Sequence, residues 1–124
     1  MKHSEGFLQI VNDAKTRISE IHVEEVRANG EASVDLVLID TREDREWKVA
    51  RAAGAVHLSK GIIERDIESA VPDKGRKLVL YCGGGFRSAL AADALQRMGY
   101  TNVFSLAGGW RAWREAAMPE ETDD

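Results

Sequence analysis

The sequence predicts an α/β fold with a small, mostly parallel sheet that is covered by helices on both faces. Two observations support this prediction. Short apolar runs such as 36–39 and 78–80 alternate along the chain with segments of helical periodicity, which is the pattern of strands joined by crossover helices. The run 36–39 is apolar throughout, as expected of a strand buried on both faces. The 124 residues are enough for one domain with its own core.

The predicted elements follow one another along the whole chain. Phe7, Ile10, Val11 and Ala14 share one helical face, so residues 1–17 are expected to form an amphipathic helix that packs on the body. The helix expected at 24–28 should end at Asn29-Gly30. Further strands are expected at 18–21, 36–39, 56–58, 77–81 and 102–106, and further helices at 42–48, 62–71 and 87–98.

The net charge of −4 is concentrated at one end of the chain. Four acidic residues lie in 120–124, so residues 1–119 contain equal numbers of acidic and basic side chains. The segment 120–124 is predicted to be a solvated acidic tail, and a docking tail for a basic partner is the alternative. The neutral body lacks the basic stripe of a nucleic-acid-binding surface, so no nucleic-acid partner is expected.

Composition also bears on compartment and cofactors. No run of about 18 apolar residues is present, so no membrane span is expected, and the N-terminal residues do not resemble a secretory signal. A single cysteine excludes an intramolecular disulfide and suits a reducing compartment, so the cytoplasm is predicted. His3 and His22 have no partners at metal-ligand spacing. No metal and no other cofactor is predicted.

The only cysteine of the chain, Cys82, is predicted to be a nucleophile. It follows the apolar run 77–81 and begins a glycine-rich loop, which can turn several N–H groups toward the sulfur. A helix N-terminus just after the loop and the Arg87 guanidinium both favour the thiolate. The alternative is a buried, inert cysteine, which would not need such a loop. The residues predicted to bind the sulfur group are Gly83, Gly84, Gly85, Phe86 and Arg87, with Ser88 as structural support.

The spacing Cys-x-x-Gly-x-Arg, between a strand and a helix, resembles the active-site loop of the rhodanese-like sulfurtransferases. Other parts of the chain are similar to this family in the same order. These parts are the strand end at 38–43, the segment 47–61 with its Gly-Ala-x-His-Leu, the run 99–103, and the last strand and helix at 106–113. The resemblance covers about residues 18–119, which are predicted to form a rhodanese-like domain.

The resemblance implies transfer of a sulfane sulfur through a cysteine persulfide. The implied donor is thiosulfate or a persulfide, and the implied acceptor is cyanide or a thiol, a protein thiol included. A thiolate that is already formed needs no general base. Gly83 stands where thiosulfate-specialised members often carry a basic residue. This difference implies that thiosulfate is a usable donor without being the physiological one.

Parallel sheets bind ligands at the carboxyl ends of their strands, which should bring Asp40, Arg42 and His57 close to the Cys82 loop. Asp40 could hold a neighbouring loop or act as a general base, and the resemblance favours the scaffold role. Arg42 is expected to add positive charge to the site, the alternative being a surface ion pair. A Cys–His dyad is disfavoured because His57 stands in an apolar segment.

Three other classes of protein use a similar loop or a similar cysteine. A phosphatase or arsenate reductase of the Cys-x5-Arg type needs one more residue than the four that separate Cys82 from Arg87. A non-catalytic binding module or a sulfur carrier could share the fold, although a binding module would be expected to lose the nucleophile. A redox-sensing thiol would need a second, resolving cysteine, which this chain lacks.

Overall fold

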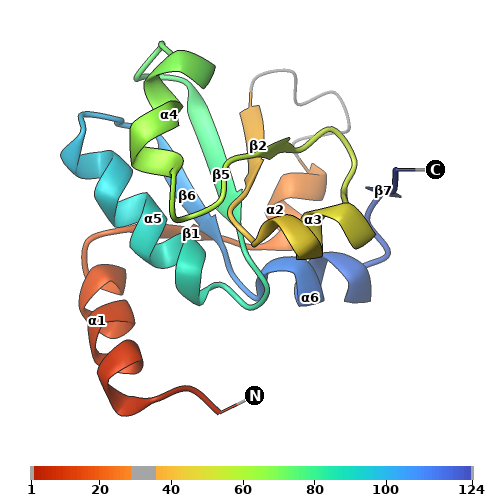
Figure 1. The fold of residues 1–124 in the computed structure, drawn as a ribbon, viewed down its shortest axis with the longest axis horizontal. Coiled ribbons are helices and arrows are strands. Elements are labelled where there is room, and N and C mark those ends of the chain that lie inside the picture. Colours follow the sequence, from red (N-terminus) through yellow and green to blue (C-terminus); the bar gives the residue numbers. More distant parts are fainter. Residues whose placement is uncertain (1, 29–35, 124) are drawn as a thin grey trace.

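The computed structural model describes residues 2–28 and 36–123, and it contains a central parallel sheet with helices on both faces (Figure 1). The five strands of this sheet stand in the order β1-β6-β5-β2-β4, and each neighbouring pair is parallel. Their bounds are β1 (Ser19–Ile21), β2 (Leu36–Asp40), β4 (Val56–His57), β5 (Lys77–Tyr81) and β6 (Val103–Leu106). The predicted α/β class is confirmed.

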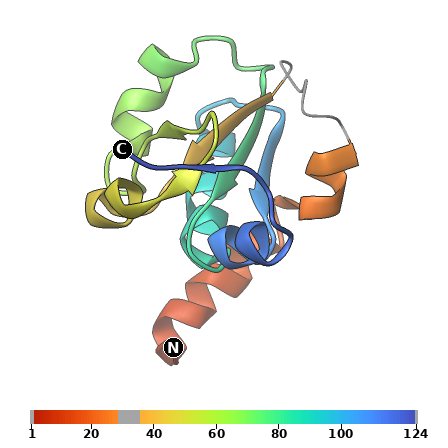
Figure 2. The same cartoon turned by 90° about the vertical axis from the view of Figure 1, so that its right-hand side faces the viewer.

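The helices lie in two layers around the sheet (Figure 2). One face is covered by α4 and α5, and the other by α2 and α6. The helix bounds are α1 (Glu5–Lys15), α2 (Val23–Ala28), α3 (Asp44–Val49), α4 (Ile63–Ala70), α5 (Phe86–Arg97) and α6 (Gly109–Glu115).

The central strand β5 contributes to the cores on both faces of the sheet. Leu78 and Leu80 pack with residues of α4 and α5, whereas Val79 and Tyr81 pack with residues of α2 and α6. All four side chains are almost fully buried, because successive residues of a strand point to opposite faces. The loop that follows β5 therefore begins from the most constrained strand of the sheet.

Two short strands lie outside the main sheet, and the sequence patterns do not predict them. β3 (Arg51–Ala52) pairs antiparallel with β7 (Glu120–Glu121). The first residues of the predicted acidic tail are thus attached to the body, although their side chains stay exposed. Asp123 also forms an ion pair with Arg51 at 2.7 Å, and Arg114 pairs with the Glu120 carboxylate at 3.0 Å. The segment is thus attached to the body at these points, while the side chains of 120–123 remain solvated.

The first helix, α1, packs against α5, and only part of its predicted apolar face is buried. Val11 and Ala14 of α1 are fully buried, but Ile10 is 54% exposed and therefore does not share their packed face. Arg17, just after α1, donates two hydrogen bonds to Asp93 of α5 at 3.0 and 2.9 Å. The predicted helix end at Asn29-Gly30 lies outside the described residues.

Candidate active site

The sulfur of Cys82 lies at the junction of β5 and α5 and accepts backbone hydrogen bonds there. The N–H of Gly85 donates to Sγ at 3.1 Å and the N–H of Ser88 at 3.4 Å. The Ser88 hydroxyl lies 3.5 Å from Sγ and 2.8 Å from the Ser105 hydroxyl. The two N–H groups belong to the N-cap and the first turn of a 12-residue helix, whose dipole also favours negative charge on the sulfur.

The three loop glycines serve different purposes. Gly85 is the N-cap of α5 with φ 96°, a left-handed conformation that side chains disfavour. Gly83 leaves room for Arg87, because a Cβ at position 83 would lie 3.1 Å from Nη2 of that guanidinium. Gly84 is exposed, and a Cβ there would lie 3.5 Å from the Phe86 ring. Only Gly85 needs its positive φ, and the other two leave space for neighbouring side chains.

Arg87 lies at the mouth of the loop, where its guanidinium is paired with a carboxylate. Its Nη1 and Nη2 groups donate to Glu46 of α3 at 3.0 and 3.4 Å. Burial lowers the pKa of Arg87, but the hydrogen bond to Glu46 and the negative charges of Cys82 and Glu46 outweigh it and raise the pKa. The Arg87 guanidinium thus lies over the loop at Gly83, and its binding of a group carried on the sulfur stays a prediction.

Phe86 joins the loop to the N-terminal helix. Its ring centroid lies 4.4 Å from that of His3 and 6.3 Å from that of Phe7, and the Lys15 ammonium lies 5.2 Å from it. Phe86 is the first residue of α5, so α1 packs beside the turn that donates to the sulfur (Figure 1).

The N-terminal turn of α6 holds the backbone of the loop, a role that sequence reasoning missed. The N–H of Trp110 donates to the Cys82 carbonyl at 2.7 Å, and the N–H of Arg111 to the Gly83 carbonyl at 3.2 Å. Gly109 has φ 52°, and a Cβ there would collide with the Cys82 carbonyl oxygen. The adjacent glycines just before the last helix were the available signal.

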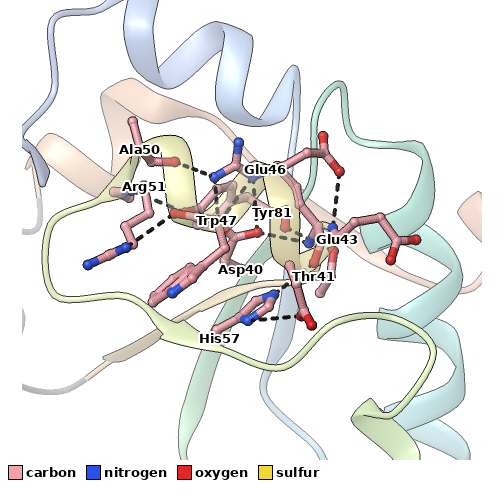
Figure 3. A network of polar contacts seen from close by, with 12 residues as sticks. Asp40, Thr41, Glu43, Glu46, Trp47, Ala50, Arg51, His57 and Tyr81 are labelled. Carbon is pink, nitrogen blue, oxygen red and sulfur yellow. Dashed lines mark hydrogen bonds and ion pairs between the residues drawn. The ribbon is translucent and has the colours of Figure 1, made fainter. Parts of the chain in front are cut away.

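Asp40 is the centre of a buried hydrogen-bond network (Figure 3). Its carboxylate accepts from the Arg42 N–H and guanidinium at 2.8–3.1 Å, and from the Tyr81 hydroxyl at 2.6 Å. The same hydroxyl accepts from the N–H of Ala52 at 3.1 Å. Burial and the Asp40 carboxylate raise the pKa of Tyr81, so the phenol stays protonated. These contacts fit a residue that joins β2, β5 and β3.

The Arg42 residue is only 3% exposed, and its guanidinium lies inside this network. Besides Asp40, it donates to the Ala50 carbonyl at 2.7 Å and lies 4.6 Å from the centroid of the Trp110 ring. Its positive charge still contributes to lowering the pKa of Glu46. Arg42 is thus held within the scaffold, and both its contribution of positive charge to the site and its direct binding of a substrate stay predictions.

His57 has structural contacts. Its Nε2 lies 2.8 Å from the Arg42 carbonyl, and its ring stacks on Trp47 with the centroids 4.8 Å apart (Figure 3). These contacts hold the end of β4 against α3, as expected for a residue with a structural role.

A separate hollow lies away from the cysteine, between α2, β2 and the C-terminal segment. Its lining includes Leu36, Leu38, Trp113 and Met118, and Cys82 is not among its lining residues. The candidate site is the cysteine loop, because the Cys82 sulfur and its N–H donors converge there. Within residues 2–28 and 36–123, no cluster of His, Cys, Asp and Glu could hold a metal ion, and no helix could cross a membrane.

Comparisons with known proteins agree with the fold. The model of the rhodanese-like domain family matches residues 22–116. The chain is 33% identical over 106 residues to thiosulfate sulfurtransferase GlpE of Ectopseudomonas mendocina, and the match covers 86% of this chain and 90% of that protein. It is 35% identical over 85 residues to Mycobacterium tuberculosis MoeZ, named as a probable adenylyltransferase/sulfurtransferase, but this match covers 68% of the chain and only 22% of MoeZ.

A solved structure from Rhodopseudomonas palustris, RPA3614, matches with a TM-score of 0.83, 30% identity and 98% coverage of both chains. It is described as a protein of unknown function and possible tyrosine phosphatase. The polysulfide-sulfur transferase homodimer of Wolinella succinogenes matches with a TM-score of 0.80 over 96% of this chain and 89% of that chain, at 24% identity. With the family model covering most of its length, the chain belongs to the family of rhodanese-like domains.

Proposed function

We propose that the protein is a sulfurtransferase that carries sulfane sulfur as a persulfide on Cys82. The observation that supports this most strongly is the pair of N–H groups, from Gly85 and Ser88, that donate to Sγ at 3.1 and 3.4 Å. Donors in this position stabilise a thiolate and equally a persulfide anion. Relatives named as sulfurtransferases, such as GlpE, support the same class of activity.

In the first step, the Cys82 thiolate attacks the outer sulfur of a donor. A new S–S bond forms, and the bond between that sulfur and its carrier breaks with its electron pair on the carrier. Thiosulfate would release sulfite, and a persulfide would release a thiolate. The persulfide anion on Cys82 keeps one negative charge, which the N–H groups of Gly85 and Ser88 and the Arg87 guanidinium stabilise.

In the second step, cyanide or an acceptor thiolate attacks the outer sulfur of the Cys82 persulfide. Thiocyanate or a new persulfide leaves, and the thiolate is restored. Because the product of the first half leaves before the acceptor reacts, the cycle has ping-pong kinetics. Neither step moves a proton, so the mechanism needs no base from His57 or Asp40.

Intact-mass spectrometry tests the proposal directly. Incubation of the wild-type protein with thiosulfate or with an alkyl persulfide should add one sulfur atom to Cys82, and cyanide should remove it. The Cys82→Ser variant should fold, take up no sulfur and show no turnover, because a hydroxyl is not ionised near neutral pH. Sulfur transfer by Cys82→Ser, or a wild-type protein that never gains sulfur, would contradict the proposal.

The description of RPA3614 makes phosphate-ester hydrolysis the second candidate function. The loop of this chain places four residues between Cys82 and Arg87, one fewer than the Cys-x5-Arg phosphatases have. We therefore expect no hydrolysis of p-nitrophenyl phosphate above the rate of Cys82→Ser. Hydrolysis that depends on Cys82 would favour the phosphatase.

A further inference from the structure

The ion pair between Arg87 and Glu46 lies at the mouth of the cysteine loop. Both side chains are 31% exposed. Glu46 is itself held in place, because its Oε1 also accepts from the N–H of Glu43 at 3.0 Å in the capping box of α3. The carboxylate thus comes from a rigid element, and it lies against the one guanidinium that belongs to the loop motif.

The position of Arg87 indicates that its pairing with Glu46 affects the binding of an anionic donor. A Cβ at Gly83 would lie 3.1 Å from its Nη2, so the guanidinium lies over the loop, and the charge of Cys82 contributes to its raised pKa. Its Nη1 and Nη2 groups, which would otherwise bind an incoming anion in bidentate fashion, both donate to Glu46. An anionic donor has to compete with a carboxylate of this same chain for those groups.

Glu46 is ionised in this position. Burial raises the pKa of its carboxyl, but the hydrogen bond from Arg87, the Glu43 N–H and the charges of Arg87 and Arg42 together lower it below its usual value. The Arg87–Glu46 pair therefore carries no net charge at neutral pH, and the Arg42 guanidinium is itself paired with Asp40 at 2.8 Å. The attraction that Arg87 offers to an incoming anion is thus reduced by a carboxylate of the same chain.

We propose that Glu46 is a specificity-determining residue that selects against small, doubly charged sulfur donors such as thiosulfate and in favour of persulfides that carry less charge. This inference rests on the proposed function, since it names the class of donor for the same site. Its physical basis is electrostatic. A dianion gains little binding free energy from an Arg87 that is already paired, and the Glu46 carboxylate repels it. A donor of lower charge is repelled less, so it loses less binding free energy.

The variant Glu46→Gln tests the inference because it removes the charge and keeps an oxygen for the Glu43 and Arg87 donors. The matched control is Asp44→Asn, which removes the same charge from the same helix at a side chain that is 84% exposed. With thiosulfate, Glu46→Gln should lower KM about fivefold and change kcat less than about twofold, as expected from the removal of one nearby, partly screened charge. With a singly charged alkyl persulfide, KM should change less than about twofold.

A second measurement does not depend on sulfur transfer. Iodoacetate is an anion and iodoacetamide is neutral, and both alkylate the Cys82 thiolate with loss of iodide. Glu46→Gln should raise the ratio of the iodoacetate rate to the iodoacetamide rate about fivefold, and Asp44→Asn should leave it within about twofold of wild type. If Glu46 only positions Arg87, its removal should slow both reagents alike and leave the ratio unchanged.

The outcomes separate the two proposals. An unchanged ratio, an equal shift in Asp44→Asn, or a raised KM for thiosulfate in Glu46→Gln would overturn the inference while leaving sulfur transfer intact. A wild-type Cys82 that takes sulfur from neither donor would overturn the proposed function, and donor selection with it, even if the alkylation ratio shifts.

Discussion

The N–H of Trp110 donates a 2.7 Å hydrogen bond to the carbonyl of Cys82, so the first turn of α6 holds the backbone of this cysteine in place. The approach is close because Gly109, at φ 52°, has no side chain between the two segments. The cysteine loop is therefore positioned by two helices. The N-terminus of α5 donates to its sulfur, and the N-terminus of α6 donates to its carbonyl.

Replacing that glycine should damage both the fold and the site. In Gly109→Ala, the new Cβ would collide with the Cys82 carbonyl and the backbone would have to keep a left-handed φ, so we expect a loss of at least about 2 kcal/mol in the free energy of unfolding. Slower alkylation of Cys82 should accompany this loss. Urea denaturation and iodoacetamide kinetics measure the two effects.

The matched control is Gly6→Ala. Gly6 lies in α1, and a Cβ added there would meet no atom within 4 Å. The substitution should therefore be neutral or should stabilise the protein by up to about 1 kcal/mol. An equal loss of unfolding free energy in both variants would show that the close contact between α6 and the cysteine loop does not stabilise the protein.

Removing the Arg87 guanidinium should weaken catalysis without abolishing sulfur uptake. In Arg87→Ala, the N–H groups of Gly85 and Ser88 still donate to the sulfur, but the cation beside it is lost. We expect turnover to fall about tenfold to a hundredfold, with the Cys82 sulfur adduct still detectable by mass. Loss of the adduct in a folded protein would mean that the backbone donors alone cannot support the persulfide.

The Tyr81 hydroxyl should contribute measurably to stability. Tyr81→Phe removes the donor to the buried Asp40 carboxylate and the acceptor for the Ala52 N–H, and unsatisfied buried groups cost about 1–3 kcal/mol. The comparison is Tyr100→Phe, which removes only a 2.6 Å hydrogen bond to the Val71 carbonyl. We expect the larger loss of unfolding free energy for Tyr81→Phe, and the reverse order would contradict the scaffold role of the Asp40 network.

The contact between Arg17 and Asp93 should make the attachment of α1 sensitive to acid. The hydrogen bond from Arg17 lowers the pKa of Asp93 below its usual value of 3.8. A lowered pKa in the folded state means that the stabilisation is fully present above pH 3.8 and is lost as the pH falls through the lower, folded value. The protection of the α1 amides from hydrogen exchange, measured relative to the intrinsic rate at each pH, should therefore fall in that acidic range in the wild-type protein.

Asp93→Asn should remove most of this pH dependence and speed the exchange of α1 at neutral pH as well. Asp13→Asn is the control, because Asp13 also accepts from Arg17 but has a side chain that is 68% exposed, where ion pairs contribute little. Identical pH profiles for wild type and Asp93→Asn would show that α1 is held by its apolar face alone.

Local sequence patterns are sufficient to predict most of the elements. The strand at 77–81 has the bounds that the sequence predicts, because an apolar run followed by Cys-Gly-Gly-Gly marks both a buried strand and its end. The predicted face of α1 is partly wrong, since Ile10 is 54% exposed. Helical spacing predicts which residues share a face of α1. How many of those residues are buried depends on the width of the contact with α5.

The pairing of β3 with β7 joins residues 51–52 with 120–121. Two-residue strands have no periodicity to detect, and a pairing so distant along the chain depends on how the intervening sheet folds. For the same reason, the composition of the acidic tail does not predict that its first residues form the strand β7. The need for glycine at position 109 is also not predicted, because it arises from a close approach to the Cys82 loop, which is distant in the sequence.

The α/β class and the position of the cysteine loop between a strand and a helix follow from the sequence alone, because strand periodicity, a lone cysteine and consecutive glycines are local properties. The partners of the charged side chains do not. The packed structure buries Arg42 against Asp40 and places Glu46 on Arg87. Ion pairs between separate elements depend on distances that the packing of the sheet and helices sets, and those distances are not encoded in any short stretch of sequence.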